Sequence, residues 1–176
     1  ARLQSPQELG LASALISACT QLALLASLGL DLGLVRFLPE YKDKPHGLIN
    51  SVLTLAGLSG IMVGIIFLIG IPLWSPALKI VITQPAYFIG FTGLTLGLVL
   101  FSMTNSSFVG LRKSRNVLFS STTAGVCRIA FLFILGLFSG SLSILFAWGL
   151  SIWIAITLST VILLPREIKN YFPSPR

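Results

Sequence analysis

Arg128 is the residue of this chain whose type and position point most directly to chemistry. It is the one charged residue in the apolar segment 117–138, and its neighbours in the sequence are small or apolar. An arginine at the centre of a membrane-spanning helix costs about 2.5–3.5 kcal/mol, so it must face a partner or water. Two roles remain open. Arg128 lines a polar cavity that receives an anion, or it is structural, bonded to carbonyls or to an acid elsewhere in the protein.

Polar side chains form stripes along three of the expected helices. At 100° per residue, Gln21 shares about a third of the helix circumference with hydroxyl groups and one carboxylate. Lipid cannot satisfy such groups, so the stripes should face neighbouring helices or a water-filled cavity. The stripes are Ser13, Ser17, Thr20, Gln21, Ser27 and Asp31; Thr92, Thr95, Ser102 and Ser106; and Ser121, Gly125, Arg128 and Ser139. A separate face carries Gly90, Gly93 and Gly97, where helices could approach closely.

Basic residues gather in three short clusters that hold nine of the twelve lysines and arginines. We expect Arg36, Arg112 and Lys113 to attract anionic headgroups at the mouth of a pathway. Together with Arg128 and Gln21, they form the candidate substrate-binding set. The clusters are Arg36/Lys42/Lys44, Arg112/Lys113/Arg115 and Arg166/Lys169/Arg176.

The elements that position these residues follow from the composition. The chain is 55% hydrophobic and 10% charged, and its uncharged runs extend to 37 residues, whereas a bilayer needs about 20 apolar residues per helix. We therefore expect an all-α, polytopic transmembrane bundle, with residues 1–176 forming a single membrane region. The predicted spans are 9–30, 48–73, 86–109, 117–138 and 142–164. An exposed connection is expected between Pro72 and Pro85, and a tight turn at 139–141.

The basic clusters also predict the orientation. Nine basic residues fall on one side of the predicted membrane and two, Arg2 and Lys79, on the other. The positive-inside rule then places the start of the chain outside and its end in the cytoplasm. Tyr87 and Trp74 are expected at the outer interface, and Tyr41 and Tyr171 at the inner one. An outer start without a signal peptide predicts a preceding helix.

Several function classes fit the sequence poorly. The net charge of +7 is explained by the membrane anchors, so nucleic acid is not an expected partner. Cys19 and Cys127 fall inside predicted spans and indicate buried thiols, and His46 is the only histidine. We therefore expect no metal, no cofactor and no enzymatic activity. A membrane ligase or acyltransferase would also need a catalytic site, for which the short outer loops leave little room.

Three segments carry a resemblance to a known family. Residues 28–39 (LGLDLGLVRFLP) resemble the end of the second helix of polysaccharide flippases, within the multidrug/oligosaccharidyl-lipid/polysaccharide exporter superfamily. Residues 5–10 (SPQELG) are similar to the short outer link between the first two helices of that family. Arg128-Ile129-Ala130, followed by Gly136, resembles its fifth helix. The likeness extends over nearly the whole chain, through spacing and topology. Asp31 departs from it, because a small or uncharged residue is expected there.

The resemblance implies helices two to six of an N-terminal lobe, an incomplete half of a two-lobed transporter in the cytoplasmic membrane. It implies partners in membrane lipid, a lipid-linked glycan, the first helix and the second lobe. The implied function is export of a lipid-linked oligosaccharide or polysaccharide precursor by alternating access. Two alternatives stay open. An ion-coupled multidrug or cation antiporter of the same superfamily would need intramembrane carboxylates, and a structural membrane subunit would need no cavity.

Overall fold

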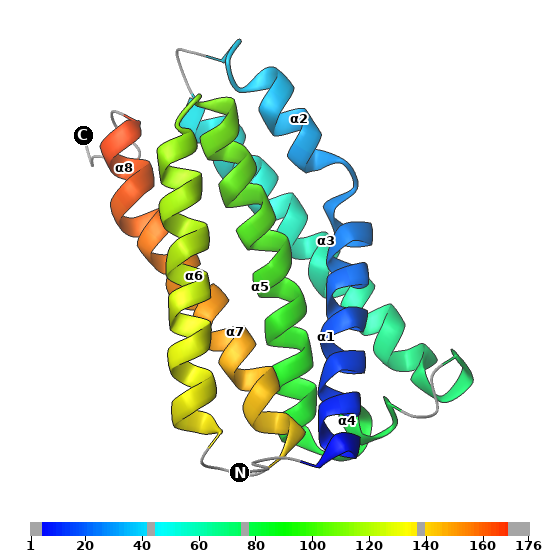
Figure 1. Cartoon of the computed structure of the whole chain (residues 1–176). Helices are drawn as coiled ribbons and strands as arrows, with labels where there is room; N and C mark the ends of the chain where they lie inside the picture. Colours follow the sequence, from blue (N-terminus) through cyan, green and yellow to red (C-terminus); the bar gives the residue numbers. More distant parts are fainter. Residues whose placement is uncertain (1–4, 42–44, 75–77, 137–139, 169–176) are drawn as a thin grey trace, which may run out of the picture.

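The computed structural model describes residues 5–41, 45–74, 78–136 and 140–168, with the Trp74 side chain excepted. Several residues of the predicted stripes, clusters and interfaces lie outside these ranges: Arg2, Lys42, Lys44, Ser139, Lys169, Tyr171 and Arg176. The described residues form a bundle of helices without strands (Figure 1). In chain order the elements are α1 (Pro6–Ser27), α2 (Leu30–Phe37), α3 (Pro45–Trp74), α4 (Ile80–Thr83), α5 (Pro85–Gly110), α6 (Ser114–Leu135), α7 (Ser141–Leu158), the π-helical segment η2 (Ser159–Leu163) and α8 (Leu164–Glu167).

Among the described residues, five helical segments are long and apolar enough to cross a membrane. This confirms the predicted all-α bundle with five spans, and these are the helices of a multi-pass membrane protein. The segments are Pro6–Ser27, Pro45–Leu73, Pro85–Gly110, Ser114–Leu135 and Ser141–Glu167. The fifth span joins α7, η2 and α8 into one continuous rod.

Helix starts follow local sequence signals. Ser5 and Glu8 form a capping box, in which the Ser5 hydroxyl accepts from the Glu8 amide and the Glu8 carboxylate accepts from the Ser5 amide. Pro6 and Pro85 occupy the first turns of α1 and α5, where a missing N–H costs nothing. These signals place both helix starts within three residues of the predicted ones.

The first predicted span ends earlier than expected. Leu28 and Gly29 both adopt left-handed backbone angles, with φ of 48° and 73°, and this breaks the helix after Ser27. The chain then forms α2, a separate helix that carries Arg36 and packs against α5 and α3. The segment that follows the first predicted span is therefore helical over residues 30–37. Leu34 and Leu38 are buried, which explains the order of this segment.

The connection between Pro72 and Pro85 also differs from the prediction. Pro72 lies inside α3, near its end, so it does not terminate the helix. Beyond it, Leu78 and Val81 are 5% and 0% exposed and belong to the hydrophobic core. The expectation of an exposed connection is wrong for these residues, because the short α4 packs against α5 and buries its apolar face.

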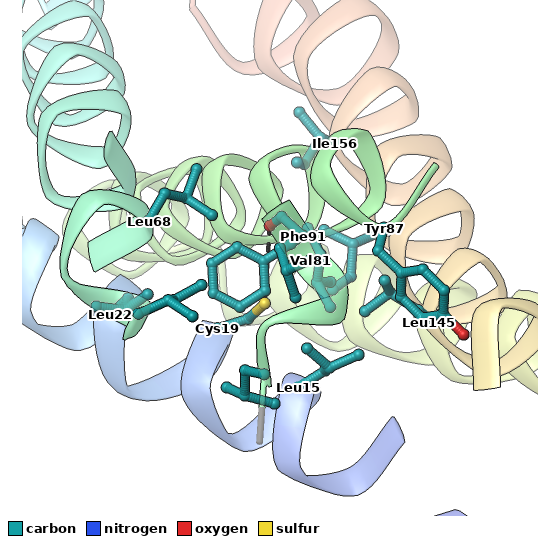
Figure 2. Packing of buried hydrophobic residues seen from close by; sticks show 13 residues of the cluster. Leu15, Cys19, Leu22, Leu68, Val81, Tyr87, Phe91, Leu145 and Ile156 are labelled. Atoms are coloured by element: carbon teal, nitrogen blue, oxygen red, sulfur yellow. Dashed lines mark hydrogen bonds between the residues drawn. The ribbon is translucent and has the colours of Figure 1, made fainter. Parts of the chain in front are cut away.

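α5 is the central element of the bundle and contacts α1, α2, α3, α4, α6 and α7. In Figure 2, Phe91 of α5 lies among buried side chains of α1, α4 and α7. The Cys19 thiol of α1 approaches the Phe91 carbonyl at 3.7 Å. α7 packs closely on α5, because a Cβ on Gly90 or Gly97 would come within 2.8 Å or 3.3 Å of α7 side chains.

The two ends of the bundle differ in charge. One end, upper in Figure 1, is formed by α2, the end of α5, the start of α6, and α8. It carries Arg36, Arg112, Lys113 and Arg166, and we name it the basic end. The other end is formed by the starts of α1, α5 and α7 with α4, and we name it the opposite end (Figure 1).

Candidate functional site

Arg128 stacks on the indole ring of Trp148, which lies on the neighbouring helix α7. The guanidinium carbon of Arg128 is 3.6 Å from the centroid of the Trp148 ring, a close cation–π contact. The Arg128 side chain is partly buried, and its Nε atom is buried without a hydrogen-bond partner. A buried donor without a hydrogen-bond partner destabilises the protein. A ligand group or water molecule that accepts a hydrogen bond from Nε would therefore be stabilising.

The packing of α6 on α7 sets this geometry. Ser120 and Ala124 are the buried residues of α6, and Arg128 follows Ala124 by one helical turn on the same side. Ser159 of η2 donates to the Ser120 hydroxyl at 3.1 Å, so the two helices are joined by a buried polar contact. Arg128 therefore lies at the edge of the interface between α6 and α7, which these contacts hold together.

Arg128 lies nearer the opposite end than the predicted span implies. α6 begins at Ser114, three residues before the predicted span, and ends at Leu135. At 1.5 Å per residue, Arg128 is about 10 Å from the end of α6 and about 20 Å from its start. The cation is still too deep for an ordinary interfacial position, but its natural approach to water is from the opposite end.

The acidic side chains of the described residues do not pair with Arg128. Glu8 caps the start of α1, and Glu167 forms an ion pair with Lys113, with Nζ and Oε2 2.8 Å apart. Asp31 lies on α2 at the basic end, and Glu40 lies in the turn that follows α2. The Lys113–Glu167 pair is the ion pair found among the described residues. Arg128 is held instead by an aromatic face, which leaves its charge uncompensated.

A second polar feature is a groove of about 370 Å³ between α1 and α5. It contains hydroxyls of two of the three predicted stripes, those on α1 and α5, together with Asn105, which was not among the predicted residues. The Oδ1 atom of Asn105 is buried without a hydrogen-bond partner. An amide inside a long uncharged run was the signal that could have identified it. The groove is lined by Thr20, Ala23, Leu24, Ser27, Leu98, Phe101, Ser102, Asn105, Ser106 and Val109.

Gln21 is exposed on the same helix as this groove but is not among its lining residues. Ser13, Ser17 and Thr20 are also exposed, so this part of the polar stripe points away from the bundle core, whereas Ser27 is buried. In a bilayer this face must meet further protein or water, because lipid cannot satisfy it. That the stripe faces neighbouring helices or a water-filled cavity stays a prediction.

The remaining candidates lie at the basic end, about 20 Å along α6 from Arg128. Arg36 is exposed and lies over the Phe37 ring, 5.5 Å from its centroid. Arg112 is exposed in the α5–α6 turn, where its φ of 58° is left-handed. Lys113 is engaged by Glu167. The structure thus gathers these three residues at one end and separates them from Arg128 and Gln21.

Other site chemistry is sparse. No group of three His, Cys, Asp or Glu side chains that could hold a metal occurs in the described ranges. Cys19 is a buried free thiol within the core, and Cys127 is a partly buried free thiol on α6. The candidate site is therefore the Arg128–Trp148 pair, and the α1–α5 groove is a separate polar feature, since its lining residues come from neither α6 nor α7.

Comparison with known proteins adds no family assignment. No protein-family model, no curated protein and no solved structure matches this chain.

Proposed function

We propose that this chain is part of a lobe of an exporter that moves a lipid-linked oligosaccharide or polysaccharide precursor across the cytoplasmic membrane by alternating access. The observation that carries the proposal is Arg128, an uncompensated cation within a membrane span, with a buried Nε that has no partner. Retaining such a residue costs about 2.5–3.5 kcal/mol on insertion scales, which favours a functional role.

The contact with Trp148 supports binding of an anion in particular. Stacking uses the flat face of the guanidinium and leaves its N–H groups, which lie in the plane, free to donate. A phosphate presents oxygens that match this planar fork, so the pyrophosphate of a lipid-linked glycan suits the site. Trp148 would hold the fork in place before the substrate arrives, which lowers the entropy lost on binding.

The charge distribution supports the proposed orientation. Under the positive-inside rule the basic end faces the cytoplasm and the opposite end faces outwards. Arg36 and Arg112, both exposed, would attract the anionic headgroup from the cytoplasmic leaflet. Lys113 is less suited to this role, because Glu167 already neutralises it. In this orientation Arg128 lies on the outer side of the membrane midplane, where it would meet the pyrophosphate late in transport.

The test is export of the glycan in cells whose only copy of the full-length protein carries Arg128→Gln. Removing charge-assisted hydrogen bonds worth about 1.5–3 kcal/mol should weaken substrate binding about tenfold or more. We expect glycan export to fall and the lipid-linked precursor to accumulate. Ile129→Ala is the matched control, because Ile129 is 60% exposed on the next position of the same helix.

Export unchanged by Arg128→Gln, at equal protein level, would contradict the proposed role of Arg128. Gradient-driven uptake of a cationic dye that survives this substitution would favour an antiporter instead. Such an antiporter would need carboxylates, and those in the described spans are confined to the span ends, at Glu8 and Glu167.

A further inference from the structure

Besides the α1–α5 groove, the structure has a cleft at the basic end, away from Arg128. It lies between the first turns of α6 and the segment η2–α8. Its volume is about 480 Å³. The sequence does not predict it, because it depends on how the end of the fifth span packs against the start of the fourth. The lining residues are Lys113, Arg115, Asn116, Phe119, Leu158, Ile162, Leu163, Arg166 and Glu167.

The charged half of this cleft is basic. It contains three cations and one carboxylate, and the carboxylate of Glu167 is already bound by Lys113 at 2.8 Å and by the Asn116 amide at 3.1 Å. Arg115 and Arg166 are exposed and form no ion pair with the described residues. Two arginines from different helices therefore face one cleft with their charge available, an arrangement that suits bidentate binding of phosphate oxygens.

The other half of the cleft is apolar and open to the membrane side. Phe119 and Ile162 are 53% and 39% exposed, and Leu158 and Leu163 continue the wall between them. All four lie deeper along the helices than the arginines. A ligand that fills both halves must carry an anionic head and a hydrocarbon chain. Inorganic phosphate would use the charged half alone.

The cleft is held in shape by contacts between its two walls. Glu167 ties the end of α8 to the start of α6 through Lys113 and Asn116, and Ser159 donates to Ser120 at its deep end. The π-helical turn Ser159–Leu163 forms one wall. Such turns are rare, occur frequently at functional sites, and here shift Ile162 and Leu163 from their α-helical positions.

From these observations we propose that the cleft is a binding site for an anionic phospholipid, with the phosphate on Arg115 and Arg166 and an acyl chain along Phe119 and Ile162. The lipid would hold the fourth and fifth spans together at the basic end. This site is separate from Arg128 and does not depend on the proposed export activity.

The experiment measures lipid binding to the full chain in neutral detergent, by native mass spectrometry and by thermal shift. Phosphatidylglycerol is titrated against phosphatidylcholine, and inorganic phosphate is added in a third series. The variants are Arg115→Gln, Arg166→Gln and Phe119→Ala. Lys79→Gln is the matched control, because it removes one exposed charge at the opposite end.

We expect phosphatidylglycerol to bind and to raise the melting temperature, with phosphatidylcholine and inorganic phosphate having little effect. Each arginine variant should weaken phosphatidylglycerol binding about tenfold, as expected for loss of a charge-assisted hydrogen bond. Phe119→Ala should weaken it less, and Lys79→Gln should leave it unchanged. The proposal is overturned if all four variants bind phosphatidylglycerol as tightly as the wild type does. It is also overturned if phosphatidylcholine binds as tightly as phosphatidylglycerol, or if inorganic phosphate alone gives the full thermal shift.

Discussion

The guanidinium of Arg128 lies 3.6 Å from the centre of the Trp148 ring and joins the fourth span to the fifth inside the predicted membrane region. Arg128→Lys tests whether shape or charge matters at this position. Lysine keeps the charge but loses the flat face and the fork of N–H donors, so it should stack poorly on Trp148. We expect glycan export between that of the wild type and that of Arg128→Gln, at equal protein level. Full export with lysine would show that only the charge is needed.

The close approach of α7 to α5 predicts a difference between two glycines on one helix. A Cβ on Gly90 would lie 2.8 Å from the Leu145 side chain, which is fully buried, whereas a Cβ on Gly93 meets nothing within 4 Å. Both substitutions to alanine gain the same helix propensity, so their difference isolates the packing. We expect Gly90→Ala to be less stable than Gly93→Ala by about 1–3 kcal/mol, from unfolding curves in detergent. Equal stability would mean that α7 can move away from α5.

Much of the fold could be predicted from the sequence because long apolar runs have few alternatives in a membrane. The five spans and their approximate ends follow from run length, prolines and basic clusters. The breaks within runs were harder to foresee. Nothing in the local sequence requires Leu28 to adopt a left-handed conformation, and the burial of Val81 depends on how α4 meets α5. Such features are decided by tertiary packing.

The candidate site was only partly predictable for the same reason. Arg128 stood out as a charge in an apolar segment, but its partner Trp148 is twenty positions away and reaches it only through the α6–α7 packing. Asn105 and the cleft of Arg115 and Arg166 likewise depend on helix register. The polarity of one helix face predicts that the face contacts another helix, a ligand or water. It does not predict which residues make that contact.

The break between α1 and α2 leads to a further prediction. Gly29 has a φ of 73°, where a side chain costs about 1–2 kcal/mol, while Gly33 is an ordinary helical residue of α2. A Cβ added at either position would meet no atom within 4 Å, so the two substitutions differ in their backbone conformation and not in packing. We expect Gly29→Ala to lower the melting temperature and Gly33→Ala to leave it unchanged or raise it. A melting temperature unaffected by Gly29→Ala would indicate that α1 and α2 can join into one helix.

A buried hydrogen bond at the opposite end provides the last prediction. The Tyr87 hydroxyl lies 2.6 Å from the Ser141 hydroxyl, and the two residues are 6% and 2% exposed. Tyr87 was expected at the lipid interface, but it is buried and joins the start of α5 to the start of α7. Tyr87→Phe should destabilise the protein by about 1–3 kcal/mol, because it leaves the Ser141 hydroxyl buried without its partner.

The double substitution Tyr87→Phe with Ser141→Ala then separates the bond from the packing. It removes both polar groups, so no hydroxyl of the pair is left unsatisfied, and the protein should regain part of the stability lost in Tyr87→Phe. Ser141→Ala alone should also be destabilising, because it leaves the buried Tyr87 hydroxyl without a hydrogen-bond partner. The measurement is the free energy of unfolding of all four proteins in the same detergent. Strictly additive effects would mean that water replaces the missing partner, and the hydrogen bond would then not hold the two span starts together.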